Sequence, residues 1–153
     1  VIWHPLTWGQ GPLTVANGFS SQADVLIETR RAARFMGATP MDRPEGIEPH
    51  PQTNKVYVPL TGNRRRTPTQ IDPANPRAEN IFGHIIELTP PNGDHTATRS
   101  QWDILAQCGD PSQVSTGATF HSKTSSNGWF EASLLYTTDA AGALLHWSLS
   151  GTQ

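Results

Sequence analysis

Residues 41–51 read MDRPEGIEPHP, and the apolar run KVYVPLT follows at residues 55–61. The alternation of this run predicts a strand with one buried face. Pro44 cannot donate a backbone hydrogen bond and favours an extended Arg43, so Glu45 is expected to follow from a stiff segment. A rigid carboxylate at the mouth of a strand suits a hard cation, which binds several oxygens at fixed distances. The alternative is that Arg43 and Glu45 form an ion pair at a turn.

The composition indicates one turn-rich globular domain. The chain has 153 residues, of which 35% are hydrophobic, and it contains 13 Pro and 13 Gly. A net charge of -2 indicates neither a nucleic acid nor an anionic membrane as a partner. No apolar stretch is long enough to span a membrane, and no secretory signal is visible. The single cysteine, Cys108, cannot form an intramolecular disulfide and is expected to be a small buried hydrophobe.

One α-helix is expected over residues 21–36. Ser21 can cap its start, and Gly37 can end it. The apolar residues on its predicted face are Ala23, Leu26, Ile27 and Ala33. Arg30 and Arg34 fall within the same face. Either these arginines extend over its rim into water, or Arg30 meets a buried carboxylate or an anionic ligand.

The remaining pattern predicts antiparallel strands. They are expected in residues 1–19, 83–90, 101–108 and, as two short strands, 134–149. A period of two places Trp102, Ile104 and Ala106 on one face of their strand. Repeated strand and turn units favour a mainly β fold and a β-propeller. At roughly 40 to 50 residues per blade the chain would supply about three blades.

Two polar segments offer weaker indications. The three arginines at residues 64–66 are typical of a solvated loop, and contact with a phosphate group is the alternative. His121 has no second histidine or cysteine at ligand spacing, so a zinc site is not expected there.

Six separated motifs resemble the PhoX family of bacterial alkaline phosphatases, over about residues 1 to 130. They are WGQGPLT (8–14), QADVLIETRRAA (22–33), MDRPE (41–45), KVYV (55–58), NPRAEN (75–80) and GHIIE (83–87). The resemblance implies a secreted or periplasmic β-propeller enzyme that hydrolyses phosphate monoesters with Ca²⁺ and Fe³⁺ ions. Both ions accept carboxylate ligands, which agrees with the expectation for Glu45.

The resemblance also implies candidate site residues. It makes Glu45 a metal ligand, while Glu79, Asn80 and Glu87 match further family positions and are additional candidates. Arg30 is a candidate partner behind the ligands. The family's cysteine ligand is expected upstream of Val1, so Cys108 does not take that role.

The chain is interpreted as a fragment of a PhoX-like domain. It starts with Val1 rather than Met, and residues 131–153 depart from the motif expected there, so this tail is divergent. Alone, the fragment is expected to be inactive. Two other functions stay open because a fold does not determine chemistry: a calcium-binding propeller module without catalysis, and a propeller hydrolase of another class, such as a lactonase.

Overall fold

The computed structural model describes residues 1–110 and 113–120. The chain divides into two compact units: residues 2–40 form one, and Val1 with the residues from Met41 onward forms the other. The strands expected in residues 134–149, the divergent tail and His121 lie outside the described residues. Within the described part, no helix is long and apolar enough to cross a membrane.

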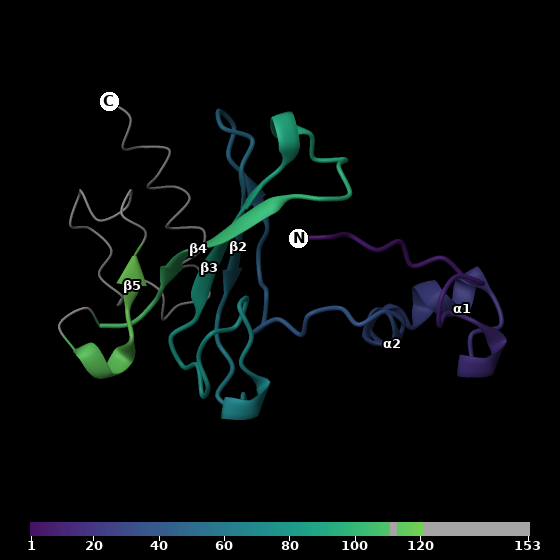
Figure 1. Cartoon of the computed structure of the whole chain (residues 1–153), viewed down its shortest axis with the longest axis horizontal. Helices are drawn as coiled ribbons and strands as arrows, with labels where there is room; N and C mark the ends of the chain where they lie inside the picture. The colour runs from purple at the N-terminus through teal and green to yellow at the C-terminus, as the bar shows by residue number, and fades with distance from the viewer. Residues whose placement is uncertain (111–112, 121–153) are drawn as a thin grey trace. The chain divides into compact units, whose positions relative to one another are not determined.

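The larger unit is built on one antiparallel sheet. Its strands follow the chain in the order β1 (Glu48–Pro49), β2 (Val56–Leu60), β3 (His84–Thr89), β4 (Gln101–Gln107) and β5 (Thr119–Phe120). Figure 1 shows β2, β3 and β4 side by side at its centre. The mainly β fold and the three long strands are therefore confirmed. The described residues form one sheet, so the expected set of about three blades stays a prediction.

A register shift interrupts the pairing of β3 with β4. Ile86 lies opposite Ile104, but Ile85 lies opposite Ala106, so β4 contains an extra residue at this point. Directly opposed residues share a face of the sheet. The expectation that Ala106 shares a face with Ile104 is therefore wrong, because the bulge moves Ala106 to the face of Ile85.

Apolar side chains on one face of the sheet form the core of this unit. The buried members are Val58, Leu60, Ile86 and Leu88, and Val1, Met41, Val56, Ala74 and Trp102 pack against them. The members of the core on β2 alternate along the strand, as the sequence of residues 55–61 predicts.

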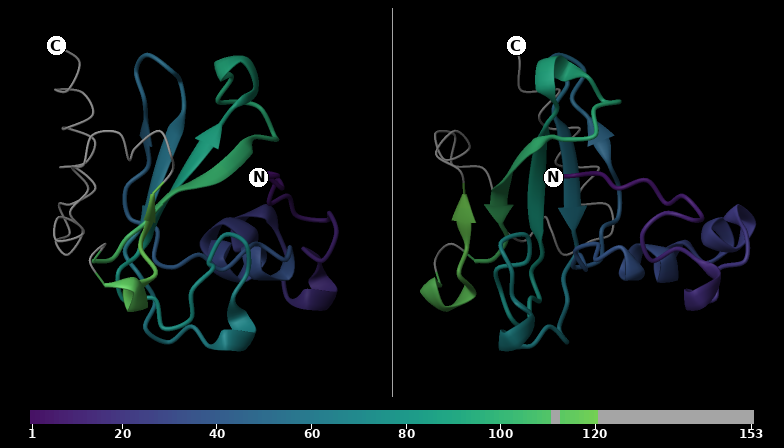
Figure 2. Two further views of the ribbon diagram at one scale, coloured as in Figure 1. Left: turned by 60° about the vertical axis from the view of Figure 1, so that its left-hand side comes forward. Right: turned by 45° about the vertical axis from the view of Figure 1, so that its right-hand side comes forward.

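The loops gather at two ends of the sheet. Figure 2 shows the long connection of residues 61–83, which contains η2 (Pro68–Gln70), at the end opposite the turns that follow β1 and β3. The long connection enters β3 through Gly83, which has φ +75°. A Cβ atom there would lie 2.2 Å from the carbonyl oxygen of Leu60, so only glycine fits.

Two short helices replace the single helix expected over residues 21–36. They are α1 (Gln22–Ile27) and α2 (Thr29–Phe35), and the backbone leaves the helical conformation at Glu28, with φ −98° and ψ 38°. The Thr29 hydroxyl donates to the carbonyl oxygen of Leu26 at 2.5 Å. This side-chain bond competes with the backbone hydrogen bonds of a continuous helix. The predicted Ser21 cap is confirmed, since its hydroxyl accepts a hydrogen bond from the Asp24 amide.

The first part of the smaller unit, residues 2–40, also differs from the prediction. Residues 3–20 form turns and the short helix η1 (Val15–Asn17) in place of the strand expected within residues 1–19. Its core consists of the fully buried side chains of Leu13, Phe19, Val25 and Ala32.

The predicted apolar face of the helical segment is wrong. Leu26 and Ile27 are 62% and 83% exposed, while Val25 and Ala32 are buried. The break at Glu28 changes the phase between the two helices, so a single helical wheel cannot identify the buried face.

Arg31, and not Arg30, is the arginine with structural contacts. It pairs with Glu28 at 2.8 Å and donates to the carbonyl oxygen of Asn17. Its guanidinium carbon lies 4.5 Å from the centroid of the Phe19 ring. Arg30 is exposed and forms no ion pair within the described residues, so the structure gives it no carboxylate partner there.

We expect Arg31→Met to lower the free energy of unfolding by about 1 kcal/mol, through loss of the cation–π contact and the hydrogen bond to Asn17. Arg30→Met is the matched control and should change it little. Urea unfolding of both variants measures the difference. Equal effects would show that the contacts of Arg31 contribute nothing specific.

Candidate functional site

A buried polar network lies at the end of the sheet where the long connection of residues 61–83 enters β3, and this end is called the base of the sheet. We call this network the Asp42 network, and its members are Asp42, Arg66, Asp72, Asn75, Arg77, Asn80 and His84. These residues come from the segment before β1, the long connection of residues 61–83 and the start of β3. Three of the motifs that carry the family resemblance therefore meet in this network.

The ion pair between Asp42 and Arg66 lies at its centre. Arg66 Nε donates to Asp42 Oδ1 at 2.7 Å, and the two side chains are 4% and 0% exposed, in that order. Arg66 also donates to the carbonyl oxygen of Gln70 and lies 3.7 Å from a carboxylate oxygen of Asp72. The prediction that these arginines are exposed to solvent is confirmed for Arg64 and Arg65. It is wrong for Arg66, which is buried because Asp42 supplies a buried countercharge.

Asn80 uses the full hydrogen-bonding capacity of its carboxamide within the network. Its Oδ1 accepts from the Gly83 amide and from Arg77, both at 3.0 Å. Its Nδ2 lies 3.1 Å from Asp42 Oδ2 and 3.2 Å from His84 Nδ1. A carboxamide offers two donors and two acceptor lone pairs, so this side chain is saturated.

The contacts of His84 determine its protonation. Its Nε2 lies 2.7 Å from the carbonyl oxygen of Ala74, which can only accept, so Nε2 carries the hydrogen. Its Nδ1 then accepts from Asn80 Nδ2. Burial lowers the pKa of His84, which favours this neutral form of the ring.

Arg77 connects the network to the residues that follow the C-terminal end of β4. It donates to the carbonyl oxygens of Cys108 and Thr116, at 2.7 and 3.0 Å, and to that of Gly83. Burial raises the pKa of the Cys108 thiol to about 12, so this side chain is a protonated, buried thiol as expected from the sequence.

The Glu45 backbone lies beside the C-terminal part of β2, and not at the start of that strand as the sequence predicted, because the chain passes antiparallel to Pro59 and Leu60 before it turns back into β2. The Glu45 amide donates to the carbonyl oxygen of Pro59 at 3.2 Å, and the Glu45 side chain is exposed. Arg43 has φ +53° and is not extended, because the Asp42 and Arg43 carbonyls turn to accept the amides of Gly62 and Thr61. No ion pair joins Arg43 to Glu45 among the described residues, so the alternative of a simple turn pair is not formed.

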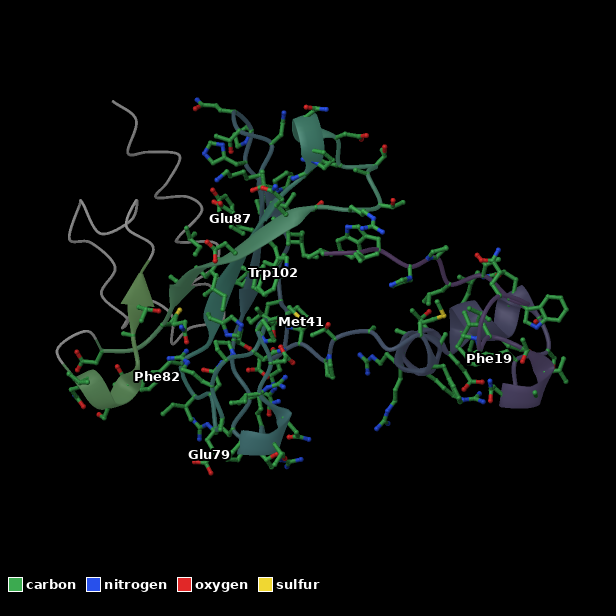
Figure 3. All side chains as sticks on the ribbon, viewed as in Figure 1. Phe19, Met41, Glu79, Phe82, Glu87 and Trp102 are labelled. Carbon is green, nitrogen blue, oxygen red and sulfur yellow. The ribbon has the colours of Figure 1, made fainter. Side chains whose placement is uncertain are left out.

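The other two acidic candidates lie apart from each other. Glu79 is exposed in the long connection, with φ +46° and its amide bonded to the carbonyl oxygen of Arg66. Glu87 lies on β3 and pairs with Lys55 at 2.6 Å. Burial and, second, the Glu87 carboxylate raise the pKa of Tyr57 to about 12. Figure 3 shows Glu79 and Glu87 toward opposite ends of the sheet.

The candidates differ in how well they suit a cation. The exposed carboxylates of Glu45 and Glu79 form no ion pair within the described part of the chain and can contribute oxygens. Glu87 is engaged by Lys55, and Asn80 could bind a metal only by breaking its present hydrogen bonds. Residues 1–110 and 113–120 contain no group of three His, Cys, Asp or Glu side chains placed to hold a metal ion.

The described residues define a mainly β protein in which the backbone segment that carries the exposed Glu45 lies beside an internal polar network. Comparison with known proteins identifies its family. The profile described as alkaline phosphatase PhoX matches residues 1–147. The chain therefore belongs to the PhoX family.

One solved structure supports this assignment. Pseudomonas fluorescens PhoX in complex with vanadate, a transition state analogue, is 38% identical in sequence and superposes with a TM-score of 0.68. The match covers 72% of this chain and 20% of that one, so the chain corresponds to about a fifth of the Pseudomonas protein. No curated protein matches the chain.

We expect Arg66→Met to destabilise the protein by about 3–5 kcal/mol, because it leaves the Asp42 carboxylate buried without its countercharge. Arg65→Met, in the same loop and exposed, is the control and should have little effect. Denaturant unfolding monitored by tryptophan fluorescence measures both. A loss below about 1 kcal/mol for Arg66→Met, the range of an exposed pair, would contradict the description of this pair as buried.

Proposed function

We propose that this chain is part of a metal-dependent phosphatase that hydrolyses phosphate monoesters. The observation that carries the proposal is the family match over residues 1–147. The similarity to a PhoX protein bound to vanadate, an analogue of the transition state, agrees with phosphoryl chemistry. The family resemblance is also the basis for proposing secretion or a periplasmic location.

The proposed architecture of the whole enzyme is a β-propeller. An antiparallel meander in which each strand pairs with the next is the unit from which propeller blades are built. The order β1-β2-β3-β4-β5 has this topology, although its first and last strands have only two residues each. We propose that this sheet is a blade, to which residues 2–40 are an addition.

The proposed metals are Ca²⁺ and Fe³⁺, with Glu45 as the principal ligand from this chain and Glu79 as a second candidate. When bound, such ions neutralise phosphate oxygens and the charge that develops on the leaving oxygen. The side-chain carboxylate of Glu45 supplies a negatively charged oxygen, and the Glu45 backbone is held by the hydrogen bond from its amide to the carbonyl oxygen of Pro59. Asn80 and Glu87 are weaker candidates, because protein groups already occupy their side chains.

We expect Glu45→Gln to reduce both metal content and phosphatase turnover of the complete enzyme by at least about 10-fold, the scale seen when groups supporting a metal site are lost. The substitution retains the shape of the side chain but removes its charge. Glu48→Gln, an exposed glutamate in β1, is the matched control and should retain both properties.

Metal analysis and hydrolysis of a chromogenic phosphate ester measure the two quantities. If Glu45→Gln loses metal but the wild-type enzyme itself shows no phosphatase activity, the result would favour a non-catalytic calcium-binding module. Unchanged metal content and turnover in Glu45→Gln would remove Glu45 from the site.

A further inference from the structure

We propose that Asp42 is a positioning residue that holds Glu45 where a cation can reach it. The inference rests on the proposed function, because the position of Glu45 matters to the reaction only if Glu45 binds a metal.

Every hydrogen-bonding group of Asp42 has a partner, and the residue is 0% exposed. Its amide donates to Asn75 Oδ1 at 3.0 Å, and its carbonyl oxygen accepts from the Gly62 amide at 3.3 Å. Its carboxylate oxygens accept from Arg66 at 2.7 Å and Asn80 at 3.1 Å. Both the backbone and the side chain of Asp42 are therefore fixed.

The segment that follows is attached to β2 by its backbone. The Thr61 amide donates to the carbonyl oxygen of Arg43 at 3.2 Å, and Pro44 forms an antiparallel bridge with Leu60. The third backbone contact is the hydrogen bond from the Glu45 amide to the carbonyl oxygen of Pro59. The Glu45 side chain has no hydrogen bond or ion pair within the described residues, so it does not help to hold the segment.

Arg43 shows why an anchor is needed. A positive φ is unfavourable for a residue with a side chain, and here the residue also precedes a proline, which restricts it further. Such a conformation persists only when the surrounding structure imposes it. The Asp42 network imposes it from one side and β2 from the other. Loss of the Asp42 contacts should let Arg43 relax, and the Glu45 backbone should then separate from Pro59.

Amide hydrogen exchange of the full chain, followed by NMR, tests this directly. In Asp42→Asn the amides of Glu45, Thr61 and Gly62 should exchange at least ~10-fold faster than in the wild type. The His50 amide, which donates to the carbonyl oxygen of Lys55 at 2.7 Å in the turn between β1 and β2, has no contact with the Asp42 network and should be nearly unchanged.

Two control variants separate positioning from general stability. Asp72→Asn removes the same charge from the same network, but Asp72 contacts Asn75, Ala74 and Arg66 and does not touch the segment. Glu45→Gln changes the exposed carboxylate itself. Neither should accelerate exchange at Glu45 or Thr61.

Equal acceleration of all these amides in Asp42→Asn, or none at Glu45, would overturn the inference. If Asp42→Asn does not fold, Asp42→Glu displaces the same carboxylate and is judged by the same comparison. The result is independent of catalysis. Selective exchange together with full activity of Glu45→Gln in the complete enzyme would refute the proposed role of Glu45 while leaving the positioning by Asp42 intact.

Discussion

The buried ion pair between Asp42 and Arg66 is the interaction on which the larger unit depends. Two charged side chains with almost no exposure are costly to remove from water unless other polar groups complete their hydrogen bonds. Asn80 donates to the Asp42 carboxylate, Asn75 accepts from the Asp42 amide, and Gln70 and Asp72 contact Arg66. A loop without regular structure can therefore be fixed against the base of the sheet.

This arrangement explains why the network lies beside the proposed site. The buried side chains of the connection of residues 61–83 are the polar ones of Arg66, Asn75 and Asn80, so polar contacts rather than apolar packing hold it. Directional hydrogen bonds to buried charges fix a loop in one conformation. The same bonds fix the backbone that leads to Glu45, whose carboxylate stays exposed and available.

The sequence predicted the elements whose signal is local. Alternating apolar residues located β2, β3 and β4, and Ser21 located the start of α1. Features that depend on partners distant in the sequence were not predictable in this way. The bulge opposite Ile85, the burial of Arg66 and the turned conformation of Arg43 all arise from tertiary contacts. The break at Glu28 misled the assignment of the buried helical face because a helical wheel assumes one continuous helix.

The sequence singled out Glu45, whose role in a site stays a prediction, but missed Asp42, Asn75, Arg77 and His84 as members of the buried network. Asp42 stood beside Glu45 in the same motif, and its only distinguishing feature was an acidic side chain beside a predicted buried strand. The motif around Asn80 was recognised, yet a ligand and a member of a hydrogen-bond network look alike in sequence. Only the contacts of its carboxamide distinguish the two roles.

One connected network fixes the side chains of Asp42, Asn80 and His84, and the protonation state of His84 reports on it. The most direct measurement is long-range ¹H–¹⁵N NMR of the His84 ring in the full chain near neutral pH. The network predicts a neutral ring with its hydrogen on Nε2, facing the carbonyl of Ala74, and Nδ1 accepting from Asn80. A charged ring, a hydrogen on Nδ1 or rapid averaging between the two neutral forms would contradict the account.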